Sequence, residues 1–135
     1  MKNTTAAAQD HNRITEAVIG AAMDVHRELG PGLLESADEA CLAYELAQRG
    51  FTVERQKEMP VTYRGIAIDC GYRMDLLVEG KVVVELKAIE ALLPVHEAQL
   101  LSYLRLSGCR VGLLINFNAK MLKTGIRRVV NGLAE

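Results

Sequence analysis

Two short aliphatic runs joined at a glycine constrain the fold of this chain more than any other feature. The runs cover residues 73–78 and 82–87, and Gly80 lies between them. Aliphatic and β-branched residues on either side of a glycine turn predict a β-hairpin. The loop length then matters, because successive side chains of a strand point to opposite faces of a sheet. We expect Val78 to pair with Val82 across a three-residue loop in which Gly80 has a positive φ angle.

This register predicts one wholly apolar face and one charged face of the hairpin. The apolar face holds Met74, Leu76, Val78, Val82, Val84 and Leu86. The other face carries Asp75 directly opposite Glu85, with their Cβ atoms about 5 Å apart. Lys87 follows Glu85 by two residues and shares its face. A two-residue loop would place the two acids on opposite faces, and the predicted site would not form.

The residue types on the charged face are typical of metal-assisted chemistry. Two carboxylates at one point repel each other unless a proton or a cation lies between them. Oxygen ligands without Cys or His favour Mg²⁺ or Mn²⁺ over zinc. An ammonium group beside them can hold a phosphate oxygen or a water molecule. Asp75, Glu85 and Lys87 therefore predict metal-assisted hydrolysis of a phosphodiester.

An alternative is that these three residues form a solvated ion-pair face of an exposed hairpin, which is common in antiparallel sheets. The position of Glu85 within the run 82–86 favours chemistry. A carboxylate buried without a partner in apolar surroundings costs free energy, so its presence there favours a functional role.

The rest of the chain alternates helical and extended patterns, which predicts a single α/β domain. Helices are expected at 12–29, 34–49 and 94–106, and further strands at 51–54, 61–63, 66–68 and 110–117, with a short edge strand from Ile126. We expect a central mixed sheet of about four to six strands flanked by helices, with the acidic cluster at one edge and a right-handed crossover. Residues 1–11 are expected to be a disordered tail, and residues 12–135 the domain.

Composition limits the partners and the location of the chain. Its 16 basic and 17 acidic residues give a net charge of −1, so any nucleic-acid contact must come from a local patch. No apolar run reaches the roughly 18 residues that would predict a membrane span, so no membrane partner is expected. Three cysteines without CxxC spacing argue against a disulfide framework and a zinc site. They suit a reducing cytoplasm, with the thiols expected to be buried.

Three motifs in order resemble the RecB-like nucleases of the PD-(D/E)XK superfamily. These are Gly71 to Asp75, Glu85-Leu86-Lys87 and Gln99-x-x-x-Tyr103. From Ile14 to Leu133 the chain also resembles the small bacterial GxxExxY proteins assigned to that superfamily, through residues 30–35, 94–100 and 111–117. The resemblance implies a restriction-endonuclease-like core.

The resemblance also implies roles for individual residues. Glu35, Asp75 and Glu85 would be carboxylates on the metal side, with the Leu86 carbonyl as a further ligand of Mg²⁺ or Mn²⁺. Lys87 would orient or activate the attacking water. Gln99 and Tyr103 would contact the nucleic-acid backbone or brace the site, and His96 would join them.

The chain departs from this family at one position, where the tyrosine that follows Glu35 by three residues is Asp38. Asp38 could bind metal, repel phosphate or face water. We favour the last, because an acid in a first helical turn is stabilised by the helix dipole.

Together these features predict a divalent-metal-dependent nuclease that hydrolyses DNA, with RNA left open. The alternatives are an inactive module of the same fold that binds nucleic acid or protein, and a phosphohydrolase that acts on a small nucleotide. A small single domain with one groove would hold a duplex better as a homodimer, so a homodimer is also left open.

Overall fold

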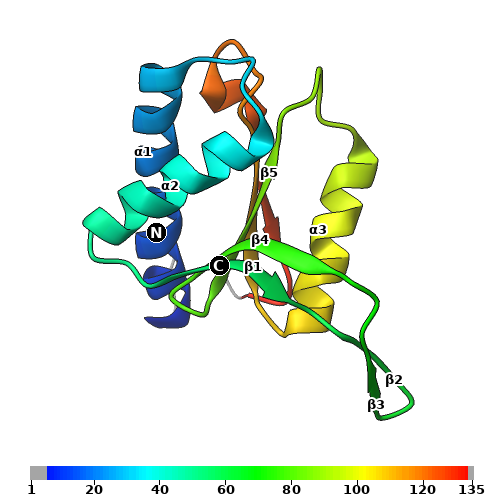
Figure 1. Cartoon of the computed structure of the whole chain (residues 1–135). Coiled ribbons are helices and arrows are strands. Elements are labelled where there is room, and N and C mark those ends of the chain that lie inside the picture. The colour runs from blue at the N-terminus through cyan, green and yellow to red at the C-terminus, as the bar shows by residue number, and fades with distance from the viewer. Residues whose placement is uncertain (1–5, 134–135) are drawn as a thin grey trace.

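The structure is a computed structural model that describes residues 6–133. Its centre is a mixed five-stranded sheet in the order β1-β4-β5-β6-β7, with α1 and α2 on one face and α3 on the other (Figure 1). The strands are β1 (Val53–Glu58), β4 (Arg73–Val78), β5 (Val82–Lys87), β6 (Val111–Asn116) and β7 (Ile126–Val130). Only β5 and β6 are parallel, joined by the crossover through α3. The predicted α/β architecture is confirmed.

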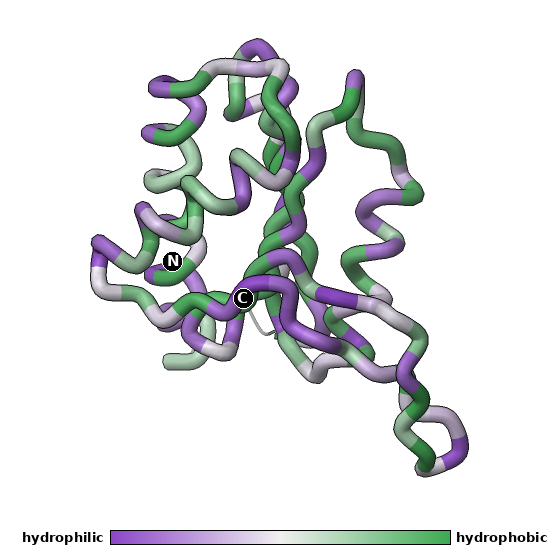
Figure 2. The backbone as a smooth tube through the Cα atoms, in the orientation of Figure 1, coloured by the Kyte–Doolittle hydropathy of each residue, from purple (hydrophilic) through white to green (hydrophobic). Residues whose placement is uncertain are grey.

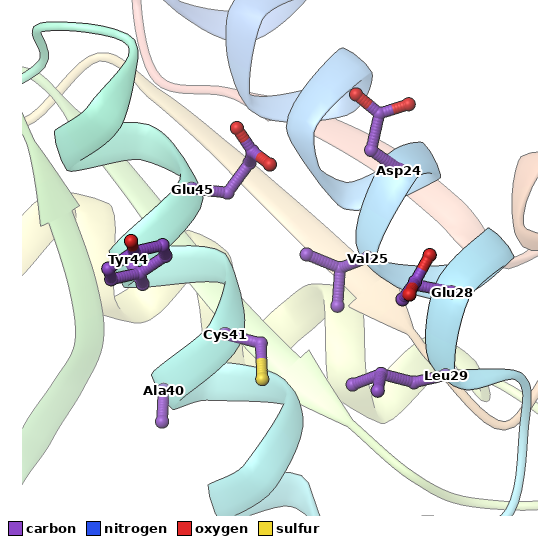
Figure 3. Close-up of a pocket in the computed structure, with 8 residues that line it drawn as sticks. All are labelled: Asp24, Val25, Glu28, Leu29, Ala40, Cys41, Tyr44 and Glu45. Atoms are coloured by element: carbon purple, nitrogen blue, oxygen red, sulfur yellow. The ribbon is translucent and has the colours of Figure 1, made fainter.

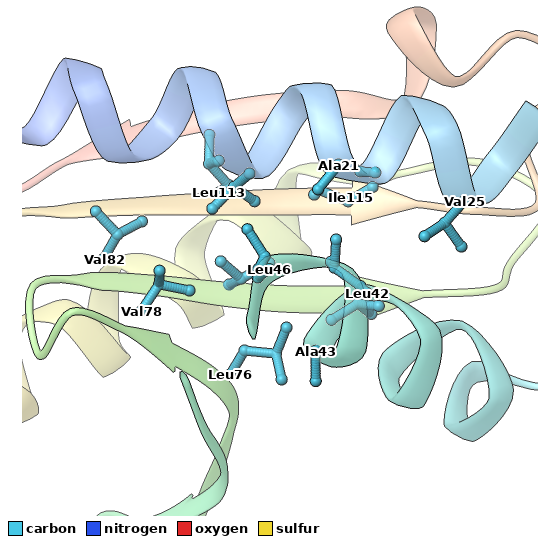
Figure 4. Close-up of a cluster of buried hydrophobic side chains, with 14 of the residues drawn as sticks. Ala21, Val25, Leu42, Ala43, Leu46, Leu76, Val78, Val82, Leu113 and Ile115 are labelled. Atoms are coloured by element: carbon cyan, nitrogen blue, oxygen red, sulfur yellow. The ribbon is translucent and has the colours of Figure 1, made fainter. Parts of the chain in front are cut away.

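Helices α1 (Ala6–Leu29) and α2 (Glu35–Gln48) cover one face of the sheet and build the larger core. Figure 4 shows side chains of both helices packed against side chains of the sheet. The helices contribute Ala21, Val25, Leu42 and Leu46, and the strands contribute Leu76, Val82, Leu113 and Ile115. The predicted α1 core positions Ile14 and Val18 are fully buried. The helical spacing of these apolar residues is therefore what covers this face of the sheet.

Helix α1 begins six residues earlier than expected, at Ala6 instead of Asn12. The prediction of a disordered tail is wrong for residues 6–11, and residues 1–5 lie outside the described residues. Ala6 to Ala8 are strong helix formers, and the ring of His11 is buried and hydrogen-bonds to the Ala7 carbonyl oxygen. Asp10 also forms an ion pair with Lys81. These tertiary contacts hold the first turns of the helix on the domain.

Helix α3 (Pro94–Ser107) covers the opposite face and packs through Leu100 and Leu104. Its start has a proline in the first turn, and it ends at Gly108 with a φ of 76°. A Cβ atom added to Gly112 on β6 would lie 2.9 Å from a methyl carbon of Leu100. A glycine at this position therefore lets the crossover helix lie close to the sheet.

The β4–β5 hairpin has the predicted register, with Val78 paired to Val82 and Gly80 at a φ of 64°. The apolar face toward α1 and α2 holds Leu76, Val78, Val82, Val84 and Leu86, as predicted. Met74 was predicted on that face, but it packs on the α3 side with Leu77 and Val83. The β4–β5 ladder ends at the pair Leu76–Val84, so strict alternation does not continue to Met74.

A second, two-stranded sheet consists of β2 (Val61–Tyr63) and β3 (Ile66–Ile68), as the turn at Arg64 and Gly65 predicted. This hairpin projects from the body of the molecule between β1 and β4 (Figure 1). Figure 2 shows hydrophobic segments on it, although it stands away from the core. The side chains of Tyr63 and Ile66 are 58% and 65% exposed.

The 3₁₀ helix η1 (Leu122–Gly125) leads from β6 into β7, the edge strand that the sequence predicted from Ile126. Within residues 6–133, none of the helices combines the length and the apolar character that crossing a membrane requires. Cys41, Cys70 and Cys109 are all free thiols. Cys70 is exposed, so the expectation that the thiols are buried is wrong for this residue.

Candidate active site

A cavity of about 320 Å³ opens between the start of α2 and the neighbouring ends of the sheet strands. It is lined by Glu35, Ser36, Glu39, Gln56, Asp75 and Leu86. Three of the residues that the resemblance assigns to the metal side, Glu35, Asp75 and Leu86, thus come together from α2, β4 and β5. The hairpin brings Asp75 beside Leu86, and the packing of α2 on the sheet brings Glu35.

The carboxylates of Asp75 and Glu85 each accept a hydrogen bond from a backbone N–H of the strand that carries the other acid. The backbone N–H of Asp75 donates to Oε1 of Glu85 at 3.2 Å, and the backbone N–H of Leu86 donates to Oδ2 of Asp75 at 2.9 Å. The two carboxylates thus occupy the place where the backbone ladder between the strands stops. Asp75 and Glu85 therefore face each other as predicted, but through these side-chain hydrogen bonds and not as a backbone-paired position of the sheet.

Glu85 is 8% exposed, and burial raises its pKa to about 9, with the charge of Asp75 adding to the effect. Lys87 acts in the opposite direction, but its influence is smaller. A carboxyl with this pKa carries a proton at neutral pH when no cation is nearby. A proton or a bound cation would therefore be stabilised beside Asp75 and Glu85.

Glu35, in the first turn of α2, belongs to the same electrostatic cluster. Burial raises its pKa, as do the charges of Asp75 and Glu39, while Lys87 and the backbone of Ala88 lower it. Lys87 thus influences both Glu35 and Glu85. Among the described residues its ammonium has no hydrogen-bonded or ion-paired partner, so it is free to contact a ligand.

Gln56 and Glu39 complete the cavity wall, and sequence reasoning missed both. Gln56 stands opposite Asp75 on β1 with a φ of 50°, a backbone region that few non-glycine residues adopt. Its Nε2 donates to Oδ1 of Asp75 at 3.3 Å and to Oε1 of Glu39 at 2.5 Å. Arg55 pairs with the other oxygen of Glu39 at 3.1 Å. This chain of contacts from α2 through β1 holds one oxygen of Asp75 in place.

Only one of these two residues carried a signal in the sequence. Glu39 follows Glu35 by four residues, which places both on one face of α2. Gln56 shows no such pattern, because its role depends on the unusual backbone of β1.

Asp38 does not face water as predicted. It is 2% exposed, and among the described residues its Oδ1 atom is a buried oxygen without a hydrogen-bond partner. Burial raises the pKa of Asp38, the charge of Glu35 adds to this, and His26 opposes it. The expectation was wrong because α2 turns this part of its first turn toward α1, where the acid is enclosed.

Two of the three residues predicted on α3 line one cavity on that side of the sheet. Gln99 and Tyr103 line a second cavity together with Tyr72. Burial raises the pKa of Tyr103, and the charges of Glu85, Tyr72 and Asp75 add to the effect. The phenol therefore lies close to the carboxylates.

His96, the third residue predicted on α3, has a structural contact. Its Nδ1 accepts a hydrogen bond from the backbone N–H of Leu93 at 2.8 Å, which caps the start of the helix. A contact between His96 and substrate stays a prediction.

A larger cavity, about 410 Å³, lies elsewhere, between α1 and α2. Figure 3 shows Val25 and Leu29 pointing from α1 toward α2 across it. None of the predicted site residues lines it. Two of its acids, Asp24 and Glu45, are already paired with Arg49.

The donor set around Asp75 suits a hard divalent cation. Within residues 6–133, no three His, Cys, Asp or Glu side chains already stand in a metal-holding arrangement. Mg²⁺, however, is usually held by one or two carboxylates and several waters. Glu35, Asp75 and the Leu86 carbonyl line one cavity and offer such oxygens, with Glu85 hydrogen-bonded beside them. The residues therefore fit the ion that the sequence implied.

Comparison with known proteins bears on this geometry. Neither a curated protein nor a solved structure matches the chain. The family model described as the PD-(D/E)XK nuclease superfamily matches residues 12–129, a range that holds all the predicted site residues and the whole five-stranded sheet except its last residue. The chain belongs to the PD-(D/E)XK nuclease superfamily, whose nucleases typically use divalent metals.

Proposed function

We propose that this protein is a divalent-metal-dependent nuclease that hydrolyses phosphodiester bonds in DNA. The observation that carries the proposal is that Glu35 and Asp75 line one cavity, with Glu85 hydrogen-bonded to the backbone of Asp75. The ammonium of Lys87 lies near enough to influence both Glu35 and Glu85. Membership of a nuclease superfamily supports the same class of reaction.

The proposed metal ligands are oxygen atoms of the cavity. Glu35, Asp75 and the Leu86 carbonyl would hold Mg²⁺ or Mn²⁺, with Glu85 sharing the charge through its contact with Asp75. A bound ion would supply Lewis-acid stabilisation of the charge that develops on the phosphate oxygens. Gln56 and the backbone N–H of Leu86 each donate a hydrogen bond to one oxygen of Asp75, and together they fix the orientation of this carboxylate.

The remaining residues act on water and substrate. Lys87 would hold the attacking water and stabilise the extra negative charge of the transition state. Gln99 and Tyr103 line the cavity on the α3 side of the sheet and would contact the nucleic acid there. The proposed mechanism is in-line attack of the positioned water on phosphorus.

A phosphohydrolase of small nucleotides is the second candidate. The volume of about 320 Å³ favours it, because sites for small molecules begin at about 300 Å³. An inactive binding module is the third, and free Lys87 beside three acids argues against it.

The first prediction is that Asp75→Ala and Lys87→Ala each abolish cleavage of DNA in Mg²⁺ or Mn²⁺. Asp75→Ala removes a proposed ligand, and Lys87→Ala removes the group that holds water. The measurement is product formation from labelled DNA, with a single nucleotide and RNA as alternative substrates and with EDTA as the metal-free control.

Lys81→Ala is the matched control, since Lys81 lies at the other end of the same hairpin and pairs with Asp10. It should retain full activity. Cleavage that persists in both Asp75→Ala and Lys87→Ala would contradict the mechanism. Hydrolysis of the nucleotide alone would support the second candidate instead.

A homodimer and a cytoplasmic location belong to the same proposal and are not needed for the chemistry. The two faces of the projecting hairpin leave room for a second copy, and sedimentation velocity would measure the oligomeric state. The three free thiols suit a reducing compartment.

A further inference from the structure

A cavity of about 300 Å³ lies on the α3 side of the sheet. It is lined by Val61, Tyr72, Gln99, Ser102, Tyr103 and Leu106. Three separate segments contribute: the projecting hairpin, the chain entering β4, and α3. Sequence reasoning had singled out only Gln99 and Tyr103.

Two tyrosine rings form one wall of this cavity. The ring centroids of Tyr72 and Tyr103 are 5.9 Å apart and the rings are tilted by 53°, so each holds the other in position. Tyr72 is 44% exposed, which leaves part of its ring open to a ligand. Val61 and Leu106 add apolar surface around the rings.

Polar groups complete the lining. The side chains of Gln99 and Ser102 have no hydrogen-bond partner within residues 6–133. An amide and a hydroxyl each offer both a donor and an acceptor. A flat, aromatic ligand with hydrogen-bonding edges fits this combination, whereas a purely apolar side chain would leave both groups unpaired.

The cavity lies near the acidic pair, although neither acid lines it. The ionisation of Tyr103 is opposed by the charges of Glu85 and Asp75, so its hydroxyl lies near both. Tyr72 precedes Asp75 by three residues on the same chain, which in an extended strand corresponds to about 10 Å. A base held at Tyr72 would leave its own sugar-phosphate backbone near the carboxylates.

The net charge of −1 means that the whole protein does not attract a nucleic-acid backbone strongly. Affinity must then come from local contacts, and the stacking of bases on aromatic rings is one such contact in proteins that bind single strands. A base inside a duplex cannot reach a side-chain ring without leaving the stack.

We propose that this cavity binds one unpaired nucleobase, stacked on Tyr72, so that the substrate is a single-stranded nucleic acid or a strand with unpaired bases. The inference rests on the proposed nuclease function, because it assumes a nucleic-acid substrate. It adds the class of that substrate and a binding residue, Tyr72, that the motifs did not assign.

The test measures binding in EDTA, so that cleavage plays no part. Fluorescence anisotropy gives the affinity for three labelled DNAs: a single strand, an abasic strand with the same number of phosphates, and a blunt duplex. The variants are Tyr72→Leu, Tyr72→Phe and the control Tyr44→Leu, which removes another exposed tyrosine, on α2.

The single strand should bind about tenfold more tightly than the abasic strand, the size of one base–aromatic stack. Tyr72→Leu should remove this difference and leave the affinity for the abasic strand unchanged. Tyr72→Phe and Tyr44→Leu should behave like the wild type. Circular dichroism of each variant checks that it is folded.

Equal affinity of the wild type for the single and abasic strands would overturn the proposal, as would an unchanged affinity in Tyr72→Leu. A dimer that dissociates in Tyr72→Leu without a change in DNA affinity would assign the cavity to a second copy, and would also overturn it. The outcome is separate from the nuclease proposal. Cleavage can succeed while Tyr72→Leu has no effect, and stacking can be present in a protein that cuts nothing.

Discussion

Asp38 occupies the first turn of α2, where the helix dipole ordinarily stabilises an acid. Its surroundings work against that stabilisation, because the carboxylate is buried and its Oδ1 has no partner among the described residues. Glu35, three residues earlier in the same turn, adds repulsion. Asp38 thus combines a helix position that favours its charge with a burial that opposes it. Such conflicts tend to lie beside functional sites.

Asp38→Asn is expected to raise the free energy of unfolding at neutral pH by about 1 kcal/mol, the lower end of the cost of an unsatisfied buried group. Burial raises the pKa of Asp38 above the ordinary value of 3.8, so the folded state binds this proton more tightly than the unfolded chain. The wild type therefore loses stability as the pH rises above about 4, and the advantage of the amide should shrink as the pH falls below it.

Urea denaturation at neutral and acidic pH would measure this difference. Glu16→Gln, at an exposed position of α1, is the matched control and should change stability little at either pH. A loss of stability in Asp38→Asn at neutral pH would show that His26 compensates the buried charge.

At the element scale, the loop between β5 and α3 depends on a side chain of β6. Asn116 is 2% exposed and stands next to Lys87 in the register of the parallel strands. Its Oδ1 accepts from the backbone N–H of Ile89 at 3.1 Å, and its Nδ2 donates to the Ile89 carbonyl oxygen at 2.9 Å. The amide thus continues the sheet beyond the last strand pair and holds the chain two residues after Lys87.

Asn116→Leu is expected to lower the free energy of unfolding by about 3 kcal/mol, or roughly 10 °C in Tm, because the half-buried N–H of Ile89 loses its acceptor and the Ile89 carbonyl loses its shorter hydrogen bond. Differential scanning calorimetry measures the change. Asn118→Leu is the control, since Asn118 is exposed and makes one longer hydrogen bond, at 3.3 Å, to the same carbonyl. It should cost less than about 1 kcal/mol. Equal effects of the two substitutions would refute the proposed role of Asn116.

At the scale of the whole molecule, stability is distributed unevenly. Strands β5 and β6 lie between two helical layers, and nearly all their side chains are buried. The β2–β3 hairpin has only its own pairing, and its residues are exposed or half-buried. An isolated two-stranded hairpin is marginally stable in water.

Amide hydrogen exchange should follow this division. The amides of β2 and β3 are expected to exchange at least about 100-fold faster than those of β5 and β6, which should open only with global unfolding. Exchange measured by mass spectrometry at several protein concentrations would test this. Protection of the hairpin that grows with concentration would show instead that a second copy covers it.

Much of this architecture could be predicted from the chain alone, because its causes are local. The turn at Gly80 and the alternation of side chains predicted the pairing of Val78 with Val82, and the helical spacing predicted three helices that correspond to α1, α2 and α3. The order of the motifs also brought Asp75 and Glu85 onto adjacent strands. These features depend on neighbours a few residues away, which the sequence shows directly.

Other features depend on contacts between distant segments, and only the tertiary structure decided them. Packing enclosed Asp38, extended α1 back to Ala6 and turned Met74 to the α3 side. It also brought Gln56 and Tyr72 to the site, through an unusual backbone in β1 and a ring contact with α3. The sequence determined which groups lie on each element. Burial and the meeting of elements determined which of those groups share a cavity, because both arise from interactions that have no local pattern.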